Sequence, residues 1–274
     1  MLVLGFDTAT AAVSVALQDG DRVAGQACAV DGRHHAELLM PMIAKVMADA
    51  GVARGDLDAI AVGVGPGPYT GLRVGVVTAR VLGSVFGIPV HGVCSLDVIA
   101  ASASASASAS ASAPAPASAP AGAGRGFLVA TDARRREVYW ARYDAAGRRM
   151  DGPLVGRAGS IPGAAELPVA GAGGQLYPEA FGQAIGPAYP DARTLCRIVA
   201  DRVAAGSVTP GSARAEGIAP GSLAPGSARA EGIAPGSPAP GSLLAPEPLY
   251  LRRPDAREPG PPKRVTPPNH PAGS

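Results

Sequence analysis

The sequence predicts an α/β protein of two related lobes, each a mixed β-sheet flanked by helices. Short apolar runs alternate with amphipathic helical stretches along residues 1–99, as in a sheet covered by helices. A strand, an acidic turn and a second strand occur at the start of the chain and again 125 residues later. Low-complexity segments follow each copy and are not expected to form a core. These observations divide the chain into two small folding units.

The first lobe, residues 1–99, is predicted to be a strand meander followed by alternating helices and strands. Its strands are expected at residues 2–6, 12–17, 23–30, 59–64 and 90–93, and its helices at 33–50, at 71–86 and from Ser95 onward. Gly51 should end the first helix, and Pro41 should kink or restart it. Thr70 and Ser95 stand where N-caps of the next two helices are expected.

The stretch 61–75 joins a buried strand to a helix through a rigid loop, and its sequence is AVGVGPGPYTGLRVG. Small residues then recur four apart along the helix, at Gly71, Gly75, Ala79 and Gly83. A ridge of small side chains lets another helix or sheet approach closely, so we expect a packing surface here rather than a catalytic one.

The second lobe, residues 125–206, begins with the same pattern as the first. The strand from Phe127 ends at Asp132, as the strand from Leu2 ends at Asp7, and Asp144 corresponds to Asp19. This duplication is the pattern of the actin-like, sugar-kinase and Hsp70 superfamily, a duplicated RNase H-like fold in which paired acidic hairpins face a nucleotide cleft. The alternative is coincidence, because strands often end in Asp.

The rest of the chain is expected to lie outside the two lobes. An Ala/Ser/Pro insertion is placed at residues 100–124, a Pro/Gly/Ser linker at 207–242 and a disordered tail at 255–274, while residues 243–254 should pack back on the lobes. The insertion and the linker should tolerate deletion, because neither is expected to bury apolar area.

Composition narrows the function classes. A net charge of +2 gives no electrostatic footprint for nucleic acid. Three scattered cysteines argue against a disulfide framework and a zinc site. No signal peptide and no long apolar run are present, so a cytoplasmic protein without membrane contact is expected.

Candidate chemistry centres on the two acidic turns. Asp7, Thr8 and Thr10 could cradle a phosphate, and Asp132 could hold a metal from the opposite lobe. The plainer interpretation is turn capping. Arginines at 134–136 would compete for Asp132, and no GK[ST] phosphate loop exists, so we expect at most a weak or vestigial nucleotide cleft.

No catalytic set and no metal site stand out elsewhere. His34 and His35 begin a helix, but leucines follow four positions along, where a metal pair would need a ligand. His91 and Cys94 lack a recognisable nucleophile motif. A small-molecule phosphotransferase and a peptidase remain alternative functions.

Several motifs together resemble the TsaB (YeaZ) family. They are FDTATAAVSVAL, RHHAELLMP, DAIAVGVGPGPYTGLRVG, GIPVHGVCSL, TDARRREVYWARY and PEPLYLRRPDA. The pairing of GPGxxTGLR with DxRxxEVYWA is specific, and the matches cover both lobes in order. The Ala/Ser stretch and the long linker depart from the family pattern.

The resemblance implies a non-catalytic dimerisation subunit in threonylcarbamoyladenosine (t6A) modification of tRNA. Its partner would be the TsaD transferase, with the TsaE ATPase joining the pair, tRNA reached through the complex, and a homodimer forming when the chain is alone. No intrinsic cofactor is implied, although ATP could bind at the complex interface with TsaE. The partner face implied by the family is assigned to His34, Leu38, Met42, Leu72, Gly75, Val76, Ala79 and Arg80.

Overall fold

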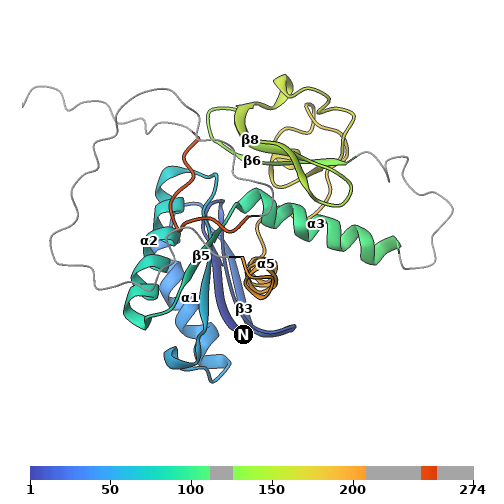
Figure 1. The fold of residues 1–274 in the computed structure, drawn as a ribbon. Coiled ribbons are helices and arrows are strands. Elements are labelled where there is room, and N and C mark those ends of the chain that lie inside the picture. The colour runs from blue at the N-terminus through green and yellow to red at the C-terminus, as the bar shows by residue number, and fades with distance from the viewer. Residues whose placement is uncertain (112–125, 208–241, 252–274) are drawn as a thin grey trace, which may run out of the picture.

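The computed structural model describes residues 1–111, 126–207 and 242–251, which form two sheets with helices around them (Figure 1). The first sheet has the strand order β3-β2-β1-β4-β5. Its strands are β1 (Leu2–Asp7), β2 (Ala12–Asp19), β3 (Arg22–Val30), β4 (Ala59–Gly63) and β5 (Val90–Val93). The three meander strands pair antiparallel, whereas β4 and β5 join in parallel, so the predicted mixed sheet is confirmed.

Helices cover both faces of this sheet. Successive side chains of β1 point to opposite faces and are buried on both, so each face needs a covering layer. Leu4 and Phe6 pack with α1 (His35–Asp49) and α2 (Tyr69–Phe86). Val3 packs on the other side with α5 (Ala192–Ala204), which comes from the second half of the chain. Figure 1 shows α5 on the side of the sheet away from α1 and α2. A short 3-10 helix, η1 (Arg54–Asp56), precedes β4.

The second sheet repeats the first with one strand fewer, in the order β8-β7-β6-β9. Its elements are β6 (Phe127–Asp132), β7 (Glu137–Tyr143), β8 (Arg149–Arg157), η2 (Ala158–Ser160), β9 (Val169–Ala170) and α4 (Gly173–Leu176). Again a three-strand antiparallel meander is followed by a parallel strand. The duplicated two-lobed fold class is therefore confirmed.

The two hairpins that begin the lobes differ in register by one residue. Asp7 pairs with Ser14, but Asp132 pairs with Val138 rather than with Tyr139, the residue 125 positions after Ser14. The second hairpin is therefore shorter at its turn. Because Asp7 and Asp132 remain the last residues of β1 and β6, the sequence recurrence located both turns correctly.

Several predicted helix boundaries need correction. Helix α1 continues through Pro41 without a restart, and Gly51 follows it at φ +66°. Helix α2 starts at Tyr69 after Pro68, with no side-chain cap, so Thr70 lies inside its first turn. Ser95 is the first residue of α3 (Ser95–Ala111), and its hydroxyl bonds to other parts of the first lobe.

The boundary placed at residue 100 was also wrong, because α3 runs on through the first half of the Ala/Ser stretch. Ala100 and Ala103 are buried beside Phe127 and Tyr143 of the second lobe. Alanine favours helix and packs closely, so this part of the segment contributes to a core. Residues 112–124 of the expected insertion lie outside the described residues.

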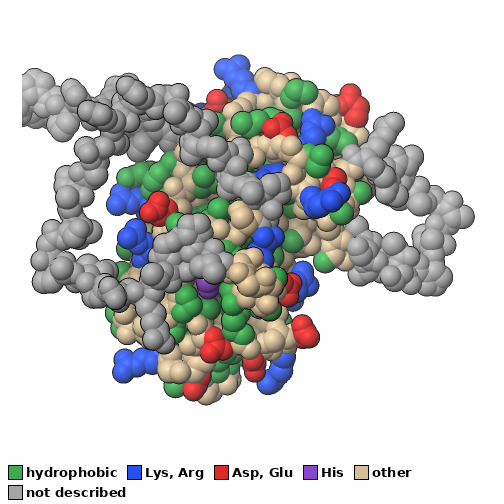
Figure 2. All heavy atoms as spheres, in the orientation of Figure 1, with side chains coloured by type: hydrophobic (Ala, Val, Ile, Leu, Met, Phe, Trp, Pro, Cys, Tyr) green, Lys and Arg blue, Asp and Glu red, His purple; other side chains and the backbone are tan. Residues whose placement is uncertain are grey.

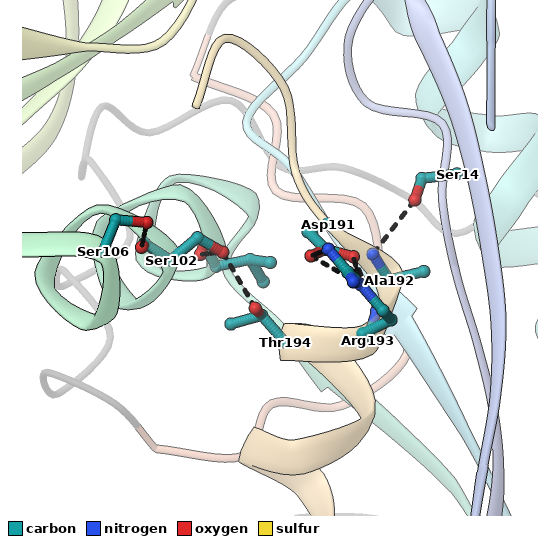
Figure 3. A network of polar contacts seen from close by, with 8 residues as sticks. Ser14, Ser102, Ser106, Asp191, Ala192, Arg193 and Thr194 are labelled. Atoms are coloured by element: carbon teal, nitrogen blue, oxygen red, sulfur yellow. Dashed lines mark hydrogen bonds and ion pairs between the residues drawn. The ribbon is translucent and has the colours of Figure 1, made fainter. Parts of the chain in front are cut away.

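Polar contacts fix the start of α5 between the first sheet and α3 (Figure 3). Asp191 caps the helix by accepting from the Arg193 backbone N–H at 3.0 Å. The Ala192 N–H donates to the Ser14 hydroxyl at 3.0 Å. On the other side, the hydroxyls of Ser102 and Thr194 lie 2.9 Å apart. The second half of the chain is thereby tied to both β2 and α3.

The described C-terminal segment, residues 242–251, packs against the first lobe and against the core that the two lobes share. Leu244 forms an antiparallel bridge with Gly92 on edge strand β5. The Leu249 N–H donates to the Val64 carbonyl at 2.8 Å, and the Tyr250 ring stacks on Tyr69 at 5.1 Å between centroids. The expected linker (208–241) and tail (252–274) lie outside the described residues.

Candidate functional site

A cavity of about 580 Å³ lies between the two lobes. Its first-lobe wall comes from the turn after β1 and the starts of α1 and α2, and its second-lobe wall comes from the end of β6 and from α4. The polar lining includes Thr8, Thr10, Arg33, His35, Asp132 and Arg134. The cavity therefore joins three of the four residues assigned to the vestigial nucleotide cleft.

The fourth, Asp7, does not line the cavity, because its side chain points into the first lobe. It is 1% exposed, accepts a 2.6 Å hydrogen bond from the Ser95 hydroxyl and a 2.8 Å bond from the Ala9 N–H. A Cβ on Gly63 would overlap its carboxyl group, so only glycine fits there. Burial raises the pKa of Asp7, and the bond from Ser95 opposes that shift.

Thr8 and Thr10 reach the cavity from the turn after β1. The Thr8 hydroxyl donates to the Gly71 carbonyl at 2.8 Å, which attaches this turn to the start of α2. The Thr10 hydroxyl accepts from the Ala12 N–H at 3.3 Å. The Thr10 hydroxyl thus caps its own turn, as the capping interpretation expected, whereas the Thr8 hydroxyl bonds to another element.

Asp132 faces the cavity but is occupied by its own loop. Its carboxylate accepts from the Arg134 N–H at 2.8 Å and lies 3.3 Å from the Arg134 guanidinium. Arg134, Arg135 and Arg136 all have φ between 55° and 61°, the left-handed region that costs roughly 1 to 2 kcal/mol per residue. The expected competition of arginine for this carboxylate is present for Arg134.

The two histidines at the start of α1 have different surroundings. His35 is buried, and its Nε2 lies 2.7 Å from the Thr10 carbonyl oxygen at the cavity wall. His34 is exposed and pairs with Asp31 at 2.8 Å, which raises the pKa of His34 and lowers that of Asp31 to about 2. Among the described residues, no group of three His, Cys, Asp or Glu side chains is placed to hold a metal.

Sequence reasoning missed Arg33, His35 and Thr131 as residues of the cavity. Thr131 precedes Asp132 at the end of β6 and is 2% exposed. The strand alternation could have indicated its burial, but only the packing of the lobes places it at the cavity.

The predicted partner face includes the wrong side of α2, because its α2 residues other than Arg80 are buried within the first lobe. Leu72, Val76 and Ala79 are buried in the core of the first lobe. A Cβ on Gly75 would lie 2.4 Å from the Thr8 hydroxyl, so the small-residue ridge packs on the protein's own sheet. Leu38 and Met42 are half-buried against the same core, and only His34 and Arg80 of the set are exposed.

The opposite side of α2 carries an exposed apolar stripe. Val77, Val81 and Val85 recur four apart and are 51%, 54% and 65% exposed. On the neighbouring α1, Met40 is 46% exposed. We refer to Met40, Val77, Val81 and Val85 as the α1/α2 face. Elsewhere, in the view of Figure 2, basic and acidic side chains are interspersed over the uncovered surface.

Cys94 belongs to a buried cluster that joins the lobes. Burial raises the pKa of its thiol to about 12, which disfavours the nucleophilic thiolate. The Arg149 guanidinium lies 3.6 Å from its Sγ and 3.5 Å from the Asp97 carboxylate. The Tyr143 hydroxyl donates to Asp97 at 2.7 Å. First-lobe residues Cys94 and Asp97 are thus bound to second-lobe residues Tyr143 and Arg149.

Comparisons with known proteins agree with this architecture. The family model of TsaD, tRNA N6-adenosine threonylcarbamoyltransferase, matches residues 25–161. An uncharacterized protein of Mycobacterium tuberculosis is 44% identical over 172 residues, 62% of this chain and 72% of the relative. The tRNA threonylcarbamoyladenosine biosynthesis protein TsaB of Escherichia coli is 34% identical over 143 residues, 52% of this chain and 55% of the relative.

A solved structure, YeaZ from Pseudomonas aeruginosa, superposes with a TM-score of 0.60 at 31% identity, covering 75% of this chain and 93% of that one. The duplicated sheets and the cavity between them define a two-lobed protein of the actin-like class. The chain belongs to the TsaB family, also called YeaZ.

Proposed function

We propose that this protein is a non-catalytic scaffold subunit in t6A modification of tRNA and that it pairs with a TsaD-like transferase. Membership in a family with members named for threonylcarbamoyladenosine biosynthesis supports the modification. No described helix is long and apolar enough to cross a membrane. We place the protein in the cytoplasm, where it would reach tRNA through the complex.

The observation that supports the scaffold role is that the carboxyl groups of both acidic turns are bound by other groups of this protein. Asp7 is enclosed in the first lobe by Ser95 and Gly63, and Asp132 is bound by Arg134. A phosphotransferase of this fold would need these carboxylates directed at a phosphate-bound metal across the cleft. The alternative phosphotransferase function is therefore less well supported, and the buried Cys94 thiol gives no support to the peptidase alternative.

The α1/α2 face supports pairing. Four exposed apolar side chains on two adjacent helices are costly to leave in water and suit a protein partner. The match to the TsaD family model also suggests that this protein and the TsaD-like transferase share a fold. Related chains can associate through equivalent faces, as subunits of symmetric dimers do. A homodimer through this face is expected when the transferase is absent, and a TsaE-like ATPase would join the pair, with ATP at that interface.

Val81→Asp tests the pairing. Placing a charge in the centre of the α1/α2 face should weaken association with the transferase at least tenfold, because the carboxylate would be desolvated without a partner. Titration calorimetry measures the association with the transferase. The formation of t6A is measured in a reconstituted mixture of this protein, transferase, ATPase, adenylate donor and unmodified tRNA.

Met150→Asp is the matched control, since Met150 is 66% exposed on β8 and lies outside the α1/α2 face. This variant should bind the transferase as tightly as the unaltered protein does, and it should support t6A formation at the same rate. Equal effects of the two substitutions would refute the interface. Full t6A formation with this protein omitted, or rapid ATP turnover by the isolated protein, would refute the scaffold role.

A further inference from the structure

The C-terminal segment, residues 242–251, lies beside α2, on the side away from α1 (Figure 1). On their common face of the first sheet, α1 packs over β2 and β3, and α2 packs over β4. The segment comes next in this order, because Leu244 bridges to Gly92 on edge strand β5 and the Leu249 N–H donates to the Val64 carbonyl after β4. Helix α2 is therefore flanked by α1 on one side and by the segment on the other.

The exposed side of α2 continues from the valines of the α1/α2 face to the first turn of the helix. Tyr69 is 41% exposed, and Arg73 is also exposed. With Val77 they recur four apart, so their side chains are neighbours on the helix surface. The Arg73 guanidinium carbon lies 5.1 Å from the centre of the Tyr69 ring, and Arg73 donates to the Tyr69 hydroxyl at 2.7 Å. The apolar stripe thus leads to an aromatic and cationic pair.

Tyr250 adds a ring from the C-terminal segment to this pair. It stacks on Tyr69 at an interplanar angle of 26° and is itself 36% exposed. The segment is anchored elsewhere, because Leu243 is 4% exposed in the core with α5 and Leu244 makes the bridge to β5. Tyr250 therefore extends the surface formed by α1 and α2.

This end of the surface is positively charged. Helix α2 contains Arg73 and Arg80 and no acidic residue, and both arginines are exposed. Neither pairs with a carboxylate of the residues that the structure describes. Arg252 and Arg253 follow the segment in the sequence. A partner that covers this end is expected to present carboxylates, because charges across a specific interface are complementary.

We propose that Tyr69, Arg73 and Tyr250 form one end of the surface that binds the TsaD-like transferase, and that transferase carboxylates lie opposite Arg73 and Arg80. This assignment rests on the pairing proposed above and adds the C-terminal segment to the interface. Tyrosine and arginine are frequent anchors of interfaces, and a ring that is already held by stacking loses little freedom on binding.

The test compares variants of the full-length protein by titration calorimetry with the transferase. Tyr250→Ala should weaken association roughly tenfold, whereas Tyr250→Phe, which keeps the ring, should bind within about threefold of the unaltered protein. Arg73→Glu should also weaken association, and more strongly at about 50 mM salt than at about 500 mM, because salt screens the repulsion between carboxylates. Arg22→Glu is the control, at an exposed arginine on the opposite edge strand, β3, and should pair normally.

Amide hydrogen exchange at Leu244 and Leu249 shows whether the segment stays docked in Tyr250→Ala. Arg73→Glu changes no printed contact of these two residues and decides the result if the segment is released.

Several outcomes would overturn the assignment. If Val81→Asp weakens pairing while Tyr250→Ala and Arg73→Glu pair like the unaltered protein, the α1/α2 face stands and the C-terminal segment lies outside the interface. Tighter pairing of Arg73→Glu would show that the partner surface is basic. Weakening of homodimer formation alone would assign this end to a second copy of the chain. Absence of any pairing by the unaltered protein would refute the proposed function together with this assignment.

Discussion

Asp7 shows how position overrides residue type. An aspartate at the end of the first strand of a duplicated fold suggests phosphate or metal chemistry, but here its carboxyl group accepts hydrogen bonds from the Ala9 N–H and the Ser95 hydroxyl inside the lobe. Ser95 also accepts from the Gly65 N–H at 3.1 Å, so one hydroxyl connects β1, the glycine loop and α3. The polar residues of the first turn therefore hold the lobe together.

This burial predicts a specific pH dependence. The pKa of Asp7 is raised from its ordinary value of 3.8, so the folded state binds this proton more tightly than the unfolded chain does. The resulting stability is fully present below about pH 3.8 and is lost as the pH rises through the folded pKa. Asp7→Asn should remove this loss, so the stability difference between variant and unaltered protein should move in the variant's favour from pH 4 to 7.

Urea unfolding at each pH measures the difference in the free energy of unfolding between Asp7→Asn and the unaltered protein. Contributions of other carboxylates, such as Asp31, whose pKa is lowered, are common to both proteins and cancel in this difference. Asp58→Asn, at an exposed aspartate that accepts from the Leu2 N–H, is the control. A constant difference between Asp7→Asn and the unaltered protein across this range would contradict the raised pKa.

At the scale of elements, α2 and α3 each bury residues that the sequence pattern did not assign to the core. The small-residue ridge of α2 packs on its own sheet, so Gly75→Leu would damage the fold before any interface. Helix α3 looks like low-complexity filler beyond residue 100, yet Ala103 is 5% exposed in a core shared with the second lobe. An alternation of Ala and Ser can form a helix because both residues are small and alanine has the highest helix propensity.

Ala103→Glu should therefore destabilise the protein by about 2 to 4 kcal/mol, because it overfills the core and buries an unpaired charge. Ala105→Glu, at an exposed position of the same helix, should change stability by less than about 0.5 kcal/mol. Thermal and urea unfolding measure both. If the two variants are equally stable, this part of α3 does not pack as described.

At the scale of the whole molecule, the two lobes share a buried core. Helix α5 packs on the first sheet, with a Cβ on Gly5 only 2.4 Å from the Cys196 Sγ. The cluster of Asp97, Tyr143 and Arg149 joins the lobes through an ion pair whose side chains are 12% and 3% exposed. Such contacts make the relative position of the two lobes part of the folded core.

The shared cores predict one cooperative unfolding transition. Trp140 reports on the second lobe, while far-UV circular dichroism reports on both, and their urea transitions should coincide. Arg149→Leu leaves the buried Asp97 carboxylate without its cation and should cost about 3 to 5 kcal/mol. Arg148→Leu, whose side chain is 79% exposed, should cost less than about 1 kcal/mol. Separate transitions for the two probes would show that the lobes fold independently.

The sequence by itself determined the local structure and the duplication. Strand alternation, the glycine after α1 and the recurring acidic turns depend on neighbours in the chain, so they identified β1 to β5, β6 and β7 and the two-lobed class. The recurrence also located Thr8, Thr10 and Asp132 near one another across the cleft.

Only the tertiary structure decided which way these residues face. Asp7 turns inward because Ser95, 88 residues away, reaches it, and the ridge of α2 is buried because Thr8 of another turn lies against Gly75. Thr131 lies at the cavity because α3, which packs in cores on both sides, holds the second sheet against the first lobe. Burial depends on contacts between residues far apart in the chain. The local pattern of a single sequence does not specify which distant residues come into contact.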